Sequence, residues 1–215
     1  MTVHLYQHGF SYISVPKCSS TSLKFLFFEI ENGRPFEPYT ENGTHWHIHN
    51  AAYPFVPFEK LPHDRIAGHR RVCVVREPVS RLLSCYANRV VARGDLNTLD
   101  LSPEQRDRGV VEAPDIGTFI RFLPEYRALS GVVAHHCEPL SHFLGRDPAY
   151  FDRIYNTGQV EDFVADLAEA IGPVPEVGRR TTSRSRSFAG DLTPQDRARI
   201  HELFAEDLEI FGAYM

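Results

Sequence analysis

The sequence predicts an α/β protein in which helices flank a central parallel β-sheet. Two segments carry this prediction, residues 10–31 and 71–90, because each has the pattern of a buried strand, a turn and a helix. A third segment of this kind follows at residues 151–171. Strands that alternate with helices normally form a parallel sheet covered on both faces. A chain of 215 residues with 42% hydrophobic content can bury one sizeable core, so we expect a single domain over residues 1–215.

The first of these segments contains an unusual turn. Its strand is the alternating stretch Phe10–Val15, its helix carries the apolar residues 23–30, and between them lies Pro16–Ser22, with the sequence Pro-Lys-Cys-Ser-Ser-Thr-Ser. The N–H groups at a helix N-terminus attract anions, and a lysine beside four successive hydroxyl residues adds charge and further donors. The turn therefore indicates a phosphate or sulfate site. An ordinary Ser/Thr helix cap is the alternative, although capping needs a single hydroxyl.

The second segment supplies candidates for another end of such a ligand. Its strand, residues 71–76, is almost continuously apolar, and Pro78 is a favoured first helical residue. Arg76 closes the strand at the edge where ligands of open α/β sheets usually bind. Ser80 and Ser84 follow four residues apart, so they share one face of the helix.

The remaining segments complete the pattern. Residues 32–63 contain many prolines and glycines and predict irregular structure. The charged stretch 94–114 predicts a mobile surface excursion or lid, with a solvated loop as an equal alternative. Asp115 is positioned to cap a helix over residues 116–123, and Thr193 to cap the last long helix.

Charge and composition narrow the function classes. A net charge of −5 argues against a general nucleic-acid binder, which would need a strongly positive surface. The N-terminus lacks the pattern of a signal peptide, and no apolar run reaches membrane-spanning length. The four cysteines are scattered without a Cys-x-x-Cys pair, which is typical of reduced thiols. We therefore expect a cytoplasmic protein with no nucleic-acid and no membrane partner.

Three stretches resemble one family. Pro16–Ser22 is similar to the 5′-phosphosulfate loop of sulfotransferases, which reads approximately Pro-Lys-x-x-Ser-Thr-Ser in the branch of the heparan sulfate uronyl 2-O-sulfotransferases. Val74–Ser84 resembles their 3′-phosphate motif, Val-Arg-Asp/Asn-Pro-x-x-Arg-Leu-x-Ser, with Glu77 where the family more often has Asp or Asn. Leu192–Tyr214 is similar to the C-terminal pattern of this branch, Leu-Thr…Asp…Phe-Gly-Tyr. The resemblance implies a three-layer P-loop-like fold, although the glycines of the nucleotide-triphosphate loop are absent.

The resemblance also implies a reaction and a set of contacts. The family transfers a sulfuryl group from 3′-phosphoadenosine 5′-phosphosulfate to an acceptor hydroxyl, here expected on a carbohydrate or small molecule, and needs no metal. Arg76 and Ser84 match the residues that bind the 3′-phosphate, and Lys17 is also expected to stabilise the transition state. Arg180 lies in the basic stretch 179–186, which is expected at the donor's phosphates or at an anionic acceptor, or else forms a solvated loop. The loop residues implied to contact the donor are Lys17, Cys18, Ser19, Ser20, Thr21 and Ser22.

A histidine-rich segment is the candidate for the catalytic base. In the uronyl 2-O-sulfotransferases a His-x-His element between the two phosphate motifs accepts the proton of the acceptor hydroxyl, and residues 45–49 match it here. Imidazole suits this task because its pKa lies near neutrality. If the segment is extended, its three histidines point the same way. We favour His47 and His49 over His45, and His69, just before the second strand, is the reserve candidate.

Three other functions remain open from the residues alone. Cys18 and Lys24 have the spacing of the Cys-x5-Arg loop of cysteine phosphatases, with lysine in place of the arginine. A non-catalytic module that binds a phosphorylated nucleotide is the second alternative. A zinc site is the third, and its possible ligands are His45, His47, His49, His135, His136 and Cys137.

Overall fold

The computed structural model describes residues 2–178 and 187–215, and this part of the chain forms two compact units, which are described separately. The sheet unit comprises Met1–Arg76, Leu140–Thr182 and Ile210–Met215, and the helical unit comprises Glu77–Pro139 and Ser183–Glu209. The single domain predicted for residues 1–215 remains a prediction beside this division. No helix in the described residues is both long and apolar enough to span a bilayer.

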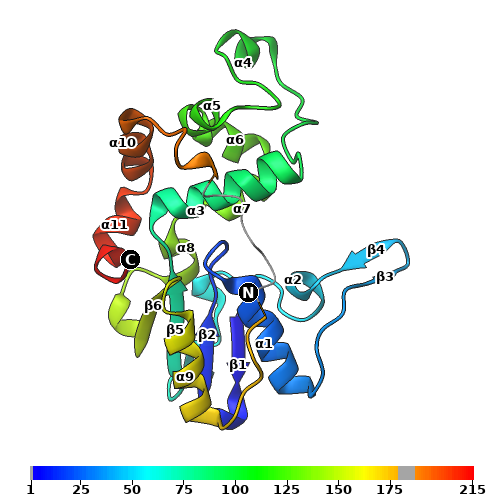
Figure 1. Cartoon of the computed structure of the whole chain (residues 1–215), viewed down its shortest axis with the longest axis vertical. Helices are drawn as coiled ribbons and strands as arrows, with labels where there is room; N and C mark the ends of the chain where they lie inside the picture. Colours follow the sequence, from blue (N-terminus) through cyan, green and yellow to red (C-terminus); the bar gives the residue numbers. More distant parts are fainter. Residues whose placement is uncertain (1, 179–186) are drawn as a thin grey trace. The chain divides into compact units, whose positions relative to one another are not determined.

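The sheet unit is built on four strands, in the spatial order β1-β2-β5-β6 (Figure 1). β1 pairs antiparallel with β2, while β2 with β5 and β5 with β6 are parallel. The predicted α/β fold with a central, mostly parallel sheet is therefore confirmed. Because Ile13 lies opposite Cys73 and Val75 opposite Asn156, the three parallel strands end at the same edge. The four strands are β1 Thr2–Leu5, β2 Phe10–Ile13, β5 Arg70–Val75 and β6 Arg153–Asn156.

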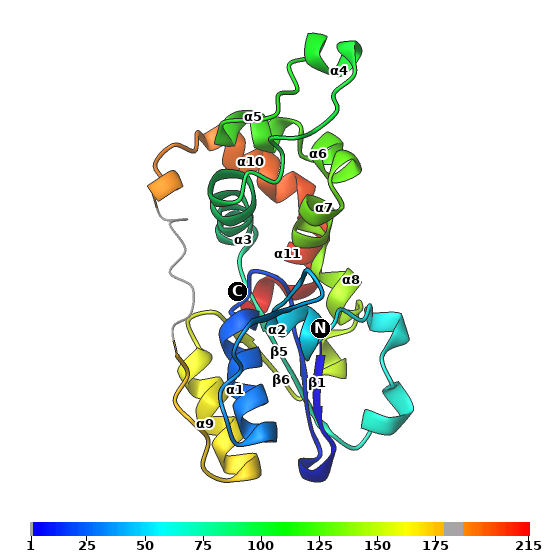
Figure 2. The ribbon, with the colours of Figure 1, turned by 90° about the vertical axis from the view of Figure 1, so that its right-hand side faces the viewer.

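Helices cover both faces of this sheet (Figures 1 and 2). On one face Tyr12 of β2 packs between Phe27 and Phe163, with ring centroids 5.5 and 5.3 Å apart, and so joins the sheet to α1 and α9. α8 and the 3₁₀ helices η2 and η3 lie on the other face (Figure 2). These elements are α1 Ser20–Asn32, α9 Val160–Ile171, α8 Leu140–Leu144, η2 Phe58–Lys60 and η3 His63–Ile66.

A small hairpin and a short helix occupy the region that the sequence left irregular. β3 and β4 pair antiparallel, with Tyr39 opposite Trp46, and α2 follows them. Ile48, the first residue of α2, is fully buried and anchors this segment to the core of the sheet unit. The elements are β3 Tyr39–Glu41, β4 Thr44–Trp46 and α2 Ile48–Ala51, and the 3₁₀ helices elsewhere in the unit are η1 Tyr6–His8, η5 Pro148–Tyr150 and η7 Gly212–Tyr214.

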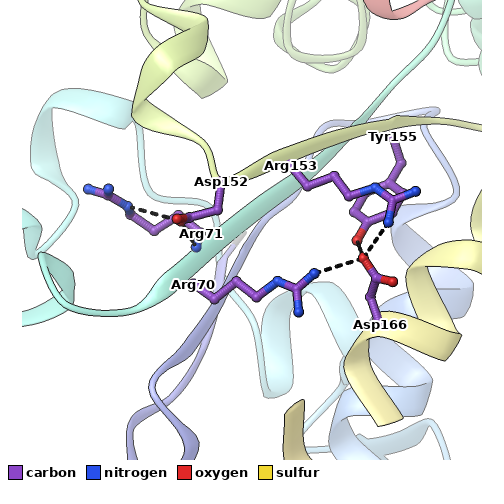
Figure 3. A network of polar contacts seen from close by, with 6 residues as sticks. All are labelled: Arg70, Arg71, Asp152, Arg153, Tyr155 and Asp166. Carbon is purple, nitrogen blue, oxygen red and sulfur yellow. Dashed lines mark hydrogen bonds and ion pairs between the residues drawn. The ribbon is translucent and has the colours of Figure 1, made fainter. Parts of the chain in front are cut away.

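A carboxylate on α9 ties that helix to two strands (Figure 3). Asp166 accepts hydrogen bonds from Arg70 at 2.8 Å, Arg153 at 2.7 Å and the Tyr155 hydroxyl at 2.5 Å. The hydrogen bond from Tyr155 is the main cause that lowers the pKa of Asp166, and the two guanidinium groups act in the same direction. Charge-assisted hydrogen bonds of this kind fix α9 against β5 and β6.

The helical unit has its own apolar core. α3 continues without a break into a π-helical segment, η4, and the predicted caps Asp115 and Thr193 are confirmed, since their side chains accept from Thr118 N at 2.7 Å and Asp196 N at 3.1 Å. The helices are α3 Pro78–Cys85, η4 Tyr86–Ala92, α4 Pro103–Asp107, α5 Ile116–Arg121, α6 Leu123–Leu129, α7 Gly131–Cys137 and α10 Pro194–Leu203, followed by α11 Ala205–Phe211.

Most of the stretch 94–114 is exposed, but three apolar side chains anchor it to the helical unit. Leu96, Leu101 and Val110 are between 0% and 5% exposed and belong to the core of the helical unit. These apolar side chains hold a largely exposed segment against the helices, and the alternatives of a lid and a solvated loop both stay predictions. α4 forms the middle of the stretch, with Ser102 as its cap.

A buried ion pair lies inside the helical unit. Arg81 Nη1 lies 3.3 Å from Asp207 Oδ2, and the two side chains are 3% and 1% exposed. Arg81 Nη2 also donates to the Glu138 carbonyl oxygen at 2.6 Å. The arginine inside the Val74–Ser84 motif and the aspartate of the closing stretch are thus partners, which gives both a structural task.

We expect Arg81→Ala to lower the free energy of unfolding by about 3–5 kcal/mol, because the buried Asp207 carboxylate loses a charged partner. Urea unfolding followed by circular dichroism measures this. Arg199→Ala is the matched control, because Arg199 pairs with Glu202 on the exposed surface of α10 and its loss should cost less than about 0.5 kcal/mol. The double variant Arg81→Met with Asp207→Leu should recover part of the loss. Equal stability of the Arg81→Ala and Arg199→Ala proteins would contradict the assignment.

Candidate functional site

The turn between β2 and α1 has a backbone suited to anions. Lys17 and Ser19 adopt left-handed conformations, with φ of 68° and 59°, and Cys18 stands between them. Non-glycine residues rarely adopt positive φ, and such residues persist only where the surroundings impose them. Left-handed residues that alternate with ordinary ones form concave backbone surfaces that bind phosphate groups in other proteins. Within the turn the Cys18 N–H itself donates to the Val15 carbonyl oxygen at 3.4 Å. The turn opens directly into the N-terminus of α1, whose first N–H groups lack intrahelical acceptors.

The hydroxyl residues of the turn do not act as an ordinary helix cap. Ser19 occupies the capping position of α1, yet its side chain makes no capping hydrogen bond. Ser20 is buried, whereas the side chains of Thr21 and Ser22 are partly exposed. This geometry favours the anion site over the capping alternative.

The Cys18 side chain points into the protein. It is fully buried and packs in the core of the sheet unit, so the residue offers its backbone to the turn. A cysteine nucleophile must reach its substrate, and the burial of Cys18 therefore disfavours the phosphatase alternative. Lys24, which stands where the Cys-x5-Arg loop of the phosphatases has its arginine, is also fully buried.

Arg76 comes to the same turn from a distant part of the chain. It directly follows β5, and its Nη1 donates to the Lys17 carbonyl oxygen at 3.2 Å. β2 and β5 are parallel neighbours that end at the same edge, which explains why residues 59 positions apart meet. The structure thus brings together the lysine of the first motif and the arginine of the second.

Ser84 belongs to the helical unit, where it is buried on α3 with 4% exposure. Glu77, the residue that departs from the family pattern, caps that helix, since its two carboxylate oxygens accept from Val79 N and Ser80 N at 2.9 Å each. Aspartate and asparagine are also preferred caps, so the departure preserves this local task.

The histidine segment reaches the first turn of α1. His49 Nε2 lies 3.1 Å from Thr21 Oγ1, and the rings of His47 and His49 stack with centroids 5.3 Å apart. α2 begins at Ile48, so the segment is not extended throughout and the expected common face of three histidines does not form. His45 stands apart on β4, exposed, with its Nδ1 3.4 Å from Thr40 Oγ1.

The reserve candidate lies elsewhere. His69 precedes β5, and its Nδ1 is 2.8 Å from Ser11 Oγ. The turn that carries Lys17 is at the other end of the same strands, about 20 Å away for a strand of this length. The geometry therefore leaves His47 and His49 as the candidates beside the turn.

Sequence reasoning assigned Lys24 no part in the donor site. Its side chain is fully buried in α1, and its Nζ lies 2.9 Å from His49 Nδ1. Burial lowers the pKa of this lysine to about 7. Two signals could have found it: a lysine inside the apolar run 23–28, and a spacing of three residues from Thr21, which puts both on one helix face.

The remaining residues singled out from the sequence are the aromatic residues near the histidines, the basic stretch and the possible metal ligands. Tyr53 and Phe55 pack in the core of the sheet unit, whereas Trp46 stacks on Tyr39 in the hairpin, with centroids 6.3 Å apart. Arg180 lies outside the described residues, as does the rest of the basic stretch 179–186. Within residues 2–178 and 187–215, no three His, Cys, Asp or Glu side chains gather in a way that could hold a metal ion.

Comparisons with known proteins agree with this geometry. A family model described as the sulfotransferase family matches residues 3–214, which include the turn, Arg76 and the histidine segment. Comparison with curated proteins gave no match, and comparison with solved structures gave none. Because the match covers nearly the whole chain, the protein belongs to the sulfotransferase family.

Proposed function

We propose that the protein transfers a sulfuryl group from 3′-phosphoadenosine 5′-phosphosulfate to the hydroxyl of an acceptor. The observation that carries this proposal is the hydrogen bond from the Arg76 guanidinium to the Lys17 carbonyl oxygen, which brings a cationic side chain to the left-handed turn and the N-terminus of α1 at one edge of the sheet. A donor with a 5′-phosphosulfate and a separate 3′-phosphate presents two anionic groups that such an edge can bind.

The turn would hold the 5′-phosphosulfate and Arg76 the 3′-phosphate. Transfer is an in-line displacement: the acceptor oxygen forms a bond to sulfur while the bond from sulfur to the bridging phosphate oxygen breaks. Negative charge then builds on that bridging oxygen, and the product is adenosine 3′,5′-bisphosphate. Lys17 and the backbone N–H groups of the turn stabilise this charge, so the protein acts mainly by positioning and electrostatics.

The acceptor hydroxyl must lose its proton during transfer. We assign the base to His47, whose partly exposed ring stacks on His49 and caps the start of α2, because His49 is already tied through its two ring nitrogens to Lys24 and Thr21 of α1. An imidazole with a pKa near neutrality can take this proton at physiological pH.

A carbohydrate is the proposed class of acceptor. Tyr39 and Trp46 form a stacked aromatic pair on the β3–β4 hairpin, in the segment that leads directly into His47. Aromatic faces of this kind suit the apolar face of a sugar ring.

The direct test uses donor labelled with ³⁵S and a panel of hydroxylated mono- and oligosaccharides and small alcohols. Labelled product should appear in equal amount to adenosine 3′,5′-bisphosphate. Tight binding of the bisphosphate without transfer to any acceptor would instead favour a non-catalytic binding module.

Two substitutions in the turn separate lysine-assisted transfer from cysteine chemistry. Lys17→Ala should lower kcat about 10²-fold, corresponding to roughly 3 kcal/mol of transition-state stabilisation. Cys18→Ser should keep most of the activity, because the Cys18 side chain is buried in the core. An active Lys17→Ala enzyme beside an inert Cys18→Ser enzyme would show that the roles are reversed.

Substitution of the histidines tests the assignment of the base. His47→Ala should reduce turnover by roughly 10²–10⁴-fold and leave the affinity for adenosine 3′,5′-bisphosphate unchanged. His45→Ala is the matched control, because His45 is exposed on the neighbouring strand and should have little effect. Initial rates with saturating donor and calorimetric binding of the bisphosphate measure the two quantities. A loss below tenfold in His47→Ala would place the base on another residue.

A further inference from the structure

Lys24 is a buried cation directly beneath the turn. An ammonium group removed from water needs acceptors, because its desolvation is costly. Its Nζ donates to the Tyr53 carbonyl oxygen at 3.4 Å and lies 2.9 Å from His49 Nδ1. His49 Nε2 lies in turn 3.1 Å from Thr21 Oγ1, so three side chains form a chain from the core to the first turn of α1.

The charge of Lys24 fixes the direction of the hydrogen bonds in this chain. A charged ammonium group can only donate, so His49 Nδ1 must accept from it. A neutral imidazole that accepts at Nδ1 carries its proton on Nε2 and therefore donates to Thr21 Oγ1. The hydroxyl proton of Thr21 is then not used by His49 and is available to a group outside the chain.

When Lys24 is neutral, the hydrogen bonds of this chain can run in the opposite direction. A neutral Lys24 can accept from His49 Nδ1, which leaves Nε2 as an acceptor for the Thr21 hydroxyl. Thr21 would then present oxygen lone pairs where the donor's phosphate binds, which is unfavourable for an anion. Burial lowers the pKa of Lys24 to about 7, so both states are accessible near neutral pH.

We propose that Lys24 and His49 are positioning residues for the donor's 5′-phosphate, and that together they turn the hydroxyl proton of Thr21 toward that phosphate. The inference rests on the proposed function, which places the phosphate at the turn. It gives His49 a task different from that of a base, and it explains why a lysine is buried at this position.

Few titratable groups surround this chain in the described residues. The ring of His47 stacks on His49, and the Tyr53 hydroxyl donates to Glu31 behind the carbonyl group that Lys24 contacts. Burial raises the pKa of Tyr53, so that side chain stays neutral at physiological pH. Lys24 is therefore the group expected to set the charge of the chain.

The test is a double-mutant cycle on the affinity of the full chain for adenosine 3′,5′-bisphosphate, measured by calorimetry at pH 7. Lys24→Met and Thr21→Val should each weaken binding about five- to tenfold, as expected for loss of one hydrogen bond to a charged group. Because Lys24 acts through Thr21, the double variant should bind within twofold of Thr21→Val. Multiplicative losses would mean that Lys24 acts by its charge alone, and unchanged affinity in Lys24→Met would mean that it does not act at all. Either result overturns the proposal.

Two further variants serve as controls for the Lys24 substitution. Lys60→Met removes a lysine that is exposed on η2 of the same unit, and its affinity should equal that of the wild type. His49→Phe keeps a ring against His47 but no ring nitrogen, and it should match Lys24→Met, which keeps the test decisive if Lys24→Met fails to fold. An affinity of His49→Phe equal to that of the wild type would overturn the proposal.

The pH dependence of binding gives a readout that a purely structural role would not change. Lys24 loses its proton as the pH rises above about 7, so wild-type affinity should fall between pH 6.5 and 8.5 more steeply than that of Lys24→Met. Parallel curves would overturn the proposal. A wild-type chain that does not bind the bisphosphate would overturn the proposed function as well. Normal wild-type binding with an additive cycle would defeat this inference alone.

Discussion

The site depends on the strained backbone at Lys17 and Ser19. A residue held in a left-handed or otherwise sparsely populated conformation costs of order 1–3 kcal/mol, and the turn keeps this form because the surrounding structure imposes it. Cys18 provides the anchor between the two residues, since its side chain is sealed in the core of the sheet unit. The strain is thus balanced by apolar packing one residue away, and the concave backbone is ready before any ligand arrives.

The rest of the sheet unit keeps this turn in place. Tyr12, in the strand that leads into it, is packed between Phe27 and Phe163, so α1 and α9 hold the strand from the same face. The Asp166 hydrogen bonds fix α9 against β5, the strand that delivers Arg76 (Figure 3). A binding edge built on paired strands and packed helices is more rigid than one built on loops alone, which suits a reaction that relies on positioning.

Much of this arrangement follows from local sequence. Strand and helix periodicity, the proline after Glu77 and the caps Asp115 and Thr193 are local signals, and each gave an element close to the observed one. The proximity of Lys17 and Arg76 could also be predicted, because parallel strands end at a common edge of the sheet. What could not be predicted was set by tertiary contacts: the α2 helix that interrupts the histidine pattern, and the packing of the charged stretch 94–114 by its few apolar residues.

The role of Lys24 also depends on a tertiary contact that the sequence does not reveal. Its position in an apolar run was visible in the sequence, but its partner His49 lies 25 residues away in a segment whose path no periodicity defines. The role of the first turn of α1 therefore emerges only when the helix, the hairpin and α2 are placed together.

A crystal structure of the chain with adenosine 3′,5′-bisphosphate would show directly whether the turn and Arg76 hold the two phosphate groups. We expect the 5′-phosphate to lie within about 2.7–3.2 Å of backbone nitrogens in residues 17–22, and the 3′-phosphate to contact the Arg76 guanidinium. A bisphosphate bound away from this turn, or bound with its 5′-phosphate in solvent, would contradict it.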